Sequence, residues 1–311
     1  MRIMTSAALS PGIILAVLAF FTTSILSARA AAEPEKSLVT GAVQFAVSRE
    51  VYTSPESFRR AIETALDNLE AEAFAIGSSP LNLAVFPEYT SAFLGLSFLS
   101  PEEITALSAD PAGNRFLMSW ALRMAEPQII SIWSEISRER AYAILAGSTL
   151  ILDTDGNIRN RALLFSAEGE LIWTQDKVFP GDPEVNLLKL KSGRISDARP
   201  FEINGYKIVT TICRDTYHQE WEKALPEAHL WIDIKANELP YTRAYYNGAL
   251  AERLPNSPTG NGLTVSLSGS IMGFTFTGPT EYLKDNGKSS RIISSTGAEN
   301  KNAVLVIALS Q

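Results

Sequence analysis

Short apolar runs alternate along this chain with longer segments whose apolar residues recur every three or four positions. The short runs predict buried strands, and the longer segments predict helices with one apolar face. Ser54-Pro55 and Ser100-Pro101 mark helix starts, because serine caps a helix N-terminus and proline fits its first turn. The predicted strands are residues 41–47, 81–86, 142–152, 206–213 and 229–234, and the predicted helices are 55–76, 114–140, 219–228 and 243–254.

The middle of the chain has a different pattern from its first half. Turns at Gly156 and Gly169 separate the runs 161–166 and 171–174, as in β-hairpins. The tail is mostly strand-like, with runs at 263–268, 271–277 and 303–309. Mixed β-α units with inserted hairpins predict an α/β fold in which helices cover the sheets. A single domain is expected, because no segment is long and polar enough to be a linker.

The first 32 residues are predicted to be a secretory signal peptide. Arg2 precedes an apolar run at 12–21, which the mostly small residues 27–32 follow. That run is about ten residues long, whereas a membrane span needs roughly twenty. Cleavage after Ala32 would leave residues 33–311, and cleavage after Ala30 would leave two residues more. The product would be an exported domain, periplasmic or secreted, without stable membrane insertion. The alternative is a membrane tether formed by the uncleaved signal.

Charge and cysteine content narrow the function further. The chain has a formal net charge of −7, and removing residues 1–32, which hold Arg2 and Arg29 but no acid, makes it −9. An acidic surface disfavours nucleic acid as a partner. Cys213 is the only cysteine, so no disulfide can form within the chain. Its thiol is therefore either a buried apolar group or a reactive one.

Three reactive side chains follow directly on strand-like apolar runs. Glu88 follows 83–86, Lys177 follows 171–174 and Cys213 follows 208–212. The carboxyl ends of strands are where α/β sheets bind ligands, so we expect the three to meet. A thiol attacks only as thiolate and therefore needs a base or a positive field. Glu88 would take the proton, and Lys177 would supply the field and then stabilise an oxyanion.

These segments resemble the landmarks of the nitrilase superfamily of carbon-nitrogen hydrolases. The family pattern has a glutamate after Phe-Pro, a lysine after a hairpin and a cysteine before x-Asp, which here are 86–88, 171–177 and 213–215 in the same order. The resemblance covers roughly residues 39–253. One landmark alone is weak, but three in order are strong. True nitrilases tend to show Cys-Trp-Glu at the third landmark, so this chain looks closer to the amidase-like branches.

The resemblance implies a single-domain, four-layer α-β-β-α sandwich, and a homodimer or higher homo-oligomer. It implies that Glu88, Lys177 and Cys213 are catalytic and that a thioester forms at Cys213 and is hydrolysed by water. The substrate would be a small carboxamide or N-carbamoyl compound. No metal or organic cofactor is expected. The backbone N–H of Arg214 would help Lys177 to hold the oxyanion.

The chain also departs from the family pattern. Many relatives carry a second glutamate shortly after the Gly-Ser stretch, where this chain has Ile151. Asp153 is the nearest acid and, with Tyr89, is a candidate substrate-binding residue. Beyond Arg253 the similarity thins, which leaves the wall of the substrate pocket built by that region without an assignment.

Several alternatives remain open at this point. Nitrile hydrolysis and amide-forming acyl transfer could use the same triad. A binding or scaffold protein with this fold and no turnover belongs to another class, and the missing second glutamate supports it. A Cys-His hydrolase would need His218 or His229 beside the thiol, and no zinc-ligand spacing is present. Asp215 and Glu220 are expected to be structural.

Overall fold

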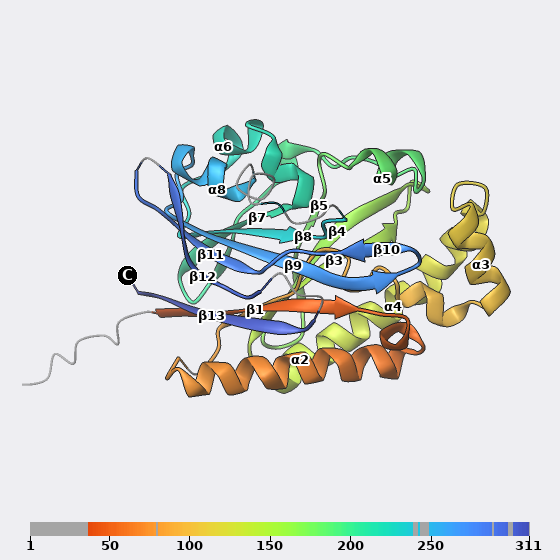
Figure 1. Cartoon of the computed structure of the whole chain (residues 1–311), viewed down its shortest axis with the longest axis horizontal. Helices are drawn as coiled ribbons and strands as arrows, with labels where there is room; N and C mark the ends of the chain where they lie inside the picture. Colours follow the sequence, from red (N-terminus) through yellow and green to blue (C-terminus); the bar gives the residue numbers. More distant parts are fainter. Residues whose placement is uncertain are drawn as a thin grey trace, which may run out of the picture. The chain divides into compact units, whose positions relative to one another are not determined.

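Strand β1 (Ser37–Val47) connects the two halves of a large mixed sheet. Its residues 40–42 pair in parallel with β2 (Leu83–Val85), and residues 45–47 pair in parallel with β9 (Asn261–Ile271). The strand order is β5-β4-β3-β2-β1-β9-β8-β7-β6, and β13 (Ala303–Ser310) pairs with β1 antiparallel. The computed structural model (Figure 1) describes residues 37–78, 80–238, 242, 249–287, 289–297 and 301–310.

The remaining elements follow in chain order. The other strands are β3 (Ala143–Leu152), β4 (Ile158–Phe165), β5 (Leu171–Asp176), β6 (Phe201–Ile203), β7 (Tyr206–Ile212), β8 (Leu230–Lys235), β10 (Phe274–Phe276), β11 (Glu281–Asp285) and β12 (Ser290–Ser295). The α-helices are α2 (Pro55–Ala75), α3 (Pro101–Ala109), α4 (Arg115–Arg140), α5 (Asp182–Asn186), α6 (Glu220–Ala224) and α8 (Leu250–Arg253). The 3-10 helices are η1 (Glu50–Tyr52), η2 (Leu94–Phe98), η3 (Ile195–Asp197), η4 (Cys213–Tyr217) and η5 (Leu254–Asn256).

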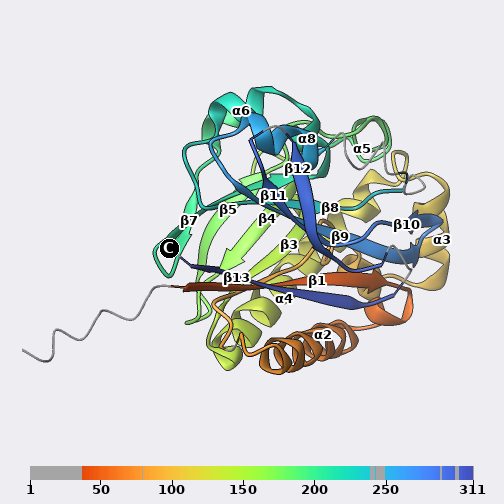
Figure 2. The ribbon, with the colours of Figure 1, turned by 60° about the vertical axis from the view of Figure 1, so that its left-hand side comes forward.

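Three buried clusters define four layers. The inner cluster lies between the two halves of the sheet, where side chains of β1, β2 and β3 face those of β7, β8 and β9. A second cluster packs α2 and α4 on the outer face of β1–β3, and a third packs α6 and α8 on the outer face of β7 and β8. Figure 2 shows these helix pairs on opposite sides of the strands. The predicted α-β-β-α sandwich is confirmed.

The two-residue period of a strand explains why β1 is apolar throughout. Leu38 and Ala42 belong to the inner cluster, whereas Val39, Val43 and Phe45 belong to the cluster under α2. Alternate side chains of a strand point to opposite faces, so a strand covered on both faces needs apolar residues at nearly every position. The continuous apolar run is therefore the mark of a strand in the middle of the sandwich.

Most predicted elements are confirmed, with shifted ends. Helix α2 begins as predicted, with the Ser54 hydroxyl accepting from the Ser57 N–H at 3.1 Å. The predicted helix 219–228 is shorter, because Leu225 precedes Pro226 and adopts an extended backbone, as residues before proline do. Of the predicted helix 243–254, residues 243–248 lie outside the described part, and α8 covers its end.

The expected signal peptide lies outside the described residues, and the described residues Ser37–Ser310 fall in one compact unit. Within them, no helix combines the length and the apolar character needed to cross a membrane.

Candidate active site

Glu88 lies in the turn that ends strand β2. The Phe86 N–H still donates to the Leu145 carbonyl at 2.9 Å, but Pro87 has no N–H and ends the pairing. Gly147 on β3 passes so close that a Cβ there would lie 1.9 Å from the Pro87 carbonyl oxygen, and its φ is +68°. Only glycine tolerates both conditions. Strand β3 therefore fixes the turn that presents Glu88.

The Glu88 carboxylate is buried and held by three donors. Lys177 Nζ and Asn160 Nδ2 each donate to Oε1 at 2.8 Å, and the Ala236 N–H donates to Oε2 at 2.9 Å. Burial raises the pKa of Glu88, and the positive charge of Lys177 opposes that rise. A carboxylate in such surroundings is a stronger base than one in water.

Lys177 follows strand β5 and is also buried. Its backbone N–H donates to the Asn160 carbonyl at 2.8 Å, which aims the side chain inward from the hairpin. The Nζ donates to Glu88 Oε1 and to both carboxylate oxygens of Glu184, each at 2.8 Å. Burial acts to lower the pKa of Lys177, but the negative charges around it outweigh burial and raise that pKa. Lys177 is therefore an ammonium ion.

Cys213 is the first residue after strand β7 and has a φ of +50°. Positive φ is rare for a non-glycine residue and often marks a functional position. The Sγ lies 3.9 Å from Asn237 Oδ1, to which the thiol donates. Burial and the negative charge of Glu88 raise the pKa of Cys213 to about 12. The resting thiol is thus protonated at neutral pH and needs a base to ionise it.

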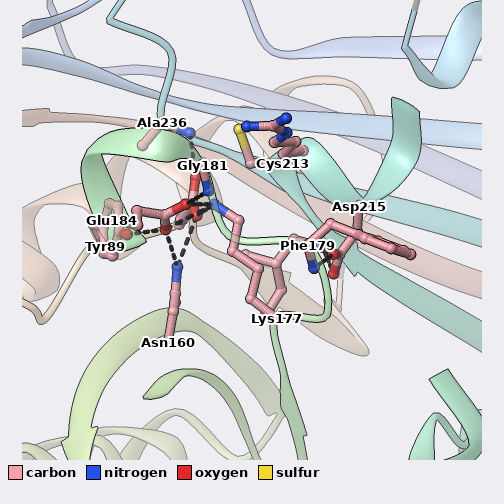
Figure 3. A network of polar contacts seen from close by, with 12 residues as sticks. Tyr89, Asn160, Lys177, Phe179, Gly181, Glu184, Cys213, Asp215 and Ala236 are labelled. Atoms are coloured by element: carbon pink, nitrogen blue, oxygen red, sulfur yellow. Dashed lines mark hydrogen bonds and ion pairs between the residues drawn. The ribbon is translucent and has the colours of Figure 1, made fainter. Parts of the chain in front are cut away.

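The three side chains predicted from the sequence therefore lie in one shielded site. Figure 3 shows Lys177 and Cys213 within the surrounding network of polar contacts. Compared with known proteins, the chain matches no family model and no curated protein. It resembles the crystal structure of an amidase from Nesterenkonia sp. with a TM-score of 0.63 and 17% identity over 91% of this chain and 93% of the amidase. A cysteine-to-serine mutant of the Nesterenkonia AN1 amidase, described as a member of the nitrilase superfamily, gives 0.63 and 17% over 88% and 92%. The chain has the nitrilase fold.

Another structure of that amidase, a cysteine-to-alanine mutant in complex with butyramide, gives a TM-score of 0.62 at 17% identity over 88% of this chain and 91% of the amidase. These likenesses cover 88–91% of this chain and 91–93% of the amidase.

Glu184 joins the site, although the sequence did not single it out. It belongs to α5, in the segment that follows Lys177, and the Gly181 N–H donates to its Oε2. The Tyr89 hydroxyl donates to its Oε1, and Lys177 contacts both oxygens (Figure 3). Burial acts to raise the pKa of Glu184, but Lys177 outweighs burial and lowers it. The signal that could have found it is a glutamate three residues after Gly181, the N3 position of a helix start.

Asp153 does not take the place of the second glutamate. Its Oδ2 pairs with Arg159 and Arg161 at 2.9 Å each, in a cluster on the β4–β5 hairpin that also contains Asp176. Strand β3 ends at Leu152, one residue before Asp153. The Asp153 side chain therefore pairs with the arginines of β4. Tyr89 does reach the site, where its hydroxyl holds Glu184 and its ring centroid lies 6.0 Å from Lys177 Nζ.

Replacing Glu184 with glutamine tests its influence on the base. Lys177 would then pair with Glu88 alone, and stronger pairing lowers the pKa of Glu88 and weakens it as a base. One pKa unit corresponds to about tenfold in rate, so we expect kcat/KM for amide hydrolysis to fall by about tenfold to a hundredfold. An ammonia-release assay measures kcat/KM. The control is Glu220→Gln, which replaces an exposed acid in the first turn of α6 and should leave kcat/KM unchanged.

Asp215 ties the lysine segment to the cysteine turn. Its Oδ1 accepts from the Val178 and Phe179 N–H groups at 3.0 and 2.8 Å, and Oδ2 accepts from the Ile212 N–H at 3.3 Å. Burial raises the pKa of Asp215 to about 7, against the lowering effect of these bonds. The arrangement agrees with the structural role expected from the sequence. The Arg214 side chain points to solvent, where its Nη1 lies 3.4 Å from Asp182, while its backbone belongs to the first turn of η4.

A second buried ion pair lies behind the cysteine and was not predicted. Lys235 Nζ and the Thr216 hydroxyl donate to Asp233 Oδ2 at 2.9 and 3.1 Å, and both charged side chains are at most 1% exposed. The Thr216 hydroxyl also lies 2.7 Å from the Cys213 carbonyl oxygen. Thr216 therefore links the ion pair to the turn that carries Cys213.

The histidines lie apart from a Cys-His arrangement. The His218 ring stacks on Phe179, with centroids 3.6 Å apart. His229 accepts from the Lys207 N–H at 2.9 Å, at the start of β7 and β8, whereas Cys213 follows the end of β7. The Cys213 thiol instead has Asn237 as its hydrogen-bond partner.

Proposed function

We propose that this chain hydrolyses a non-peptide C–N bond of a small carboxamide through a Cys213 thioester. The observation that carries the proposal is the Glu88–Lys177 pair at 2.8 Å, buried beside a protonated thiol on a strained turn. A carboxylate, an ammonium and a thiol in one dry site supply a base, an oxyanion donor and a nucleophile.

Acylation begins when Glu88 takes the Sγ proton and the thiolate attacks the amide carbon. The carbonyl electrons move to oxygen, and Lys177 Nζ and the Arg214 backbone N–H stabilise the oxyanion. When the tetrahedral intermediate collapses, Glu88 gives its proton to the leaving nitrogen. Ammonia departs, and the acyl group remains on Cys213 as a thioester.

Deacylation repeats these steps with water. Glu88 removes a proton from the water molecule, and the hydroxide adds to the thioester carbon. Collapse of the second intermediate releases the carboxylic acid and returns the proton to sulfur. Lys177 stays charged throughout because the acids around it raise its pKa.

The geometry supports an enzyme over a silent scaffold. The missing second glutamate was the sequence argument for a scaffold, and Glu184 now stands beside Lys177. Buried charges are costly to retain without a function. The solved relatives are amidases by their descriptions, which supports amide over nitrile substrates.

The proposal is tested by ammonia release from a panel of neutral amides, ureido acids and nitriles, with Cys213→Ala as the blank. Intact-protein mass spectrometry of a quenched reaction should show the mass of one acyl group on Cys213. Ammonia from nitriles alone would replace the proposal by nitrilase activity, and hydroxamate formation in preference to acid would replace it by acyl transfer. A folded protein that gives no product and no acyl adduct from any substrate would favour the scaffold.

The pH profile of kcat/KM should show an acid limb set by Glu88. The base must be ionised, so activity is present above the Glu88 pKa and lost as the pH falls through it. Burial raises that pKa above its ordinary 4.5, so we expect the midpoint of the limb above pH 4.5. No matching alkaline loss is expected below about pH 9, since the pKa values of Cys213 and Lys177 are both raised. A stopped assay from pH 4 to 9, with folding followed by circular dichroism, checks this.

We also propose that the chain acts outside the cytoplasm and as a homodimer. Residues 1–32 carry the signal-like pattern. Phe116, Trp120 and Met124 form an exposed apolar stripe on α4, spaced four residues apart. Residues at that spacing share one face of a helix, and exposed apolar patches favour association.

A further inference from the structure

An apolar cavity of about 130 Å³ opens beside the catalytic groups. Tyr89 and Glu184 line it and also belong to the catalytic network. Its remaining wall comes from η2, α3, α4 and the β9–β10 hairpin, with Leu107, Met118, Leu122 and Phe276 among the side chains. Figure 1 shows α3, α4, α5 and β10 at the same end of the sheet.

We propose that this cavity binds the acyl chain of the substrate and selects neutral amides with an apolar chain of about four to six carbons or one aromatic ring. The inference rests on the amidase function proposed above and names its substrate class. A dry cavity of about 150 Å³ lined by Leu, Ile and Phe holds a benzene-sized guest. A cavity of 130 Å³ fits a group of that size and not a long fatty chain.

The order of the chemical steps favours the acyl chain over the leaving group. The acyl group stays bound to Cys213 through both half-reactions, whereas the amine must depart before water can attack. An apolar cavity beside the catalytic network suits the part of the substrate that stays. A side chain held there also keeps the thioester carbon in place while water approaches.

The cavity wall also predicts which substrates are rejected. Among the described residues that line it, the charged groups are Glu184 and Glu238, which are both acids. A carboxylate at the end of the acyl chain would lose its hydration against apolar carbon and approach like charges. Ureido acids and half-amides of dicarboxylic acids should therefore be poor substrates.

The test compares straight-chain amides from acetamide to octanamide. Burial of each methylene raises kcat/KM by about fourfold, so hexanamide should exceed acetamide by on the order of a hundredfold, with no further gain at octanamide. Adipic monoamide, which carries a terminal carboxylate, should be at least about a hundredfold worse than hexanamide. Equal kcat/KM for acetamide and hexanamide, or for hexanamide and adipic monoamide, would overturn the proposal.

Two variants locate the effect in the cavity. Leu122→Trp fills it and should abolish the gain from acetamide to hexanamide, whereas Leu171→Trp, the same change at an exposed position of β5, should keep the gain. Met118→Ala enlarges the cavity and should move the optimum to a longer chain, which tests the idea even if Leu122→Trp does not fold. If neither cavity variant shifts the chain-length preference, the cavity is not the acyl site.

Binding separates this proposal from the function on which it rests. Calorimetric titration of the Cys213→Ala protein with hexanamide and acetamide measures the cavity without turnover. Tighter binding of hexanamide with no hydrolysis of any amide by the wild type would reject the amidase and keep the cavity. Hydrolysis of amides with no dependence of rate or binding on chain length would support the amidase function and reject the cavity as the acyl site.

Discussion

The Cys213→Ala and Glu88→Gln variants are each expected to lower kcat/KM for amide hydrolysis by about 10⁴-fold or more, and the double variant should be no worse than either. A thiol with a pKa of about 12 is almost wholly protonated at neutral pH. Without the base, Cys213 therefore does not form the thiolate that attacks the amide. Residues that act as one unit show such strongly non-additive losses. Single-turnover ammonia release measures the loss of activity in the two single variants and the double variant.

Alkylation of Cys213 should distinguish the role of Glu88 as base from the reactivity of the Cys213 thiol itself. The negative charge of Glu88 raises the Cys213 pKa and Lys177 lowers it, so Glu88→Gln should lower that pKa. We therefore expect iodoacetamide to label the Glu88→Gln thiol at a lower pH than the wild-type thiol, although turnover is lost. A Glu88→Gln protein that keeps more than a tenth of wild-type activity would show that another group is the base.

Folding must be checked in that experiment. Glu88 accepts from Ala236 at one oxygen and from Lys177 at the other, and a glutamine can accept at only one of them. Some loss of stability is thus expected, of about 1–3 kcal/mol for an unsatisfied buried donor. Thermal unfolding of each variant distinguishes this cost from a loss of chemistry.

The strands could be predicted from local apolar runs, whereas the four-layer sandwich and the catalytic roles of the three central residues were implied by the resemblance to the nitrilase superfamily. Lys177 and Cys213 directly follow strands β5 and β7, and Glu88 lies three residues after the end of β2. Strands β7 and β8 are parallel neighbours, so Cys213 and Ala236, which follow them, lie at the same edge of the sheet.

Glu184 escaped prediction because its position depends on a loop. The segment after Lys177 is rich in Pro, Gly and Asp, and no periodicity indicates where such a loop folds. The short helix α5 begins there, and a glutamate at the N3 position of a helix can cap it by accepting from the N-cap N–H. In this protein the same carboxylate also binds Lys177, which only the tertiary structure reveals.

The Asp233–Lys235 pair was missed for a different reason. The segment Leu230–Lys235 is a buried strand, and strand prediction relies on apolar content. Asp and Lys are almost never buried unless paired. The two residues are two apart and share a face of β8, so charged residues of opposite sign at that spacing inside an apolar run are a signal that could have been used.

Lys235→Met should be among the most destabilising single changes in the protein. It leaves Asp233 buried without its cation, and breaking such a pair costs about 3–5 kcal/mol. Urea unfolding at pH 7 measures the loss, with Lys223→Met on the exposed side of α6 as a control that should change little. A loss below about 1 kcal/mol would contradict the view that the pair is desolvated.

The stability lost in Lys235→Met should depend on pH in a defined direction. Burial already raises the pKa of Asp233, and Lys235 opposes that rise, so removing Lys235 raises the pKa further. The folded variant then binds a proton that the unfolded chain releases above about pH 4. Its stability is therefore highest at acid pH and falls as the pH rises towards the folded pKa. The deficit relative to wild type should be smaller at pH 5 than at pH 8.

The double variant Asp233→Asn/Lys235→Met should recover most of the lost stability, because no charge is left to desolvate. The asparagine oxygen can still accept from the Thr216 hydroxyl, as Asp233 Oδ2 does now. Recovered stability together with recovered kcat/KM would show that the turn needs an acceptor and not a charge. Recovered stability with kcat/KM still low would show instead that the charged pair sets the reactivity of the thiol, in keeping with the opposing effects of Lys235 and Asp233 on the Cys213 pKa.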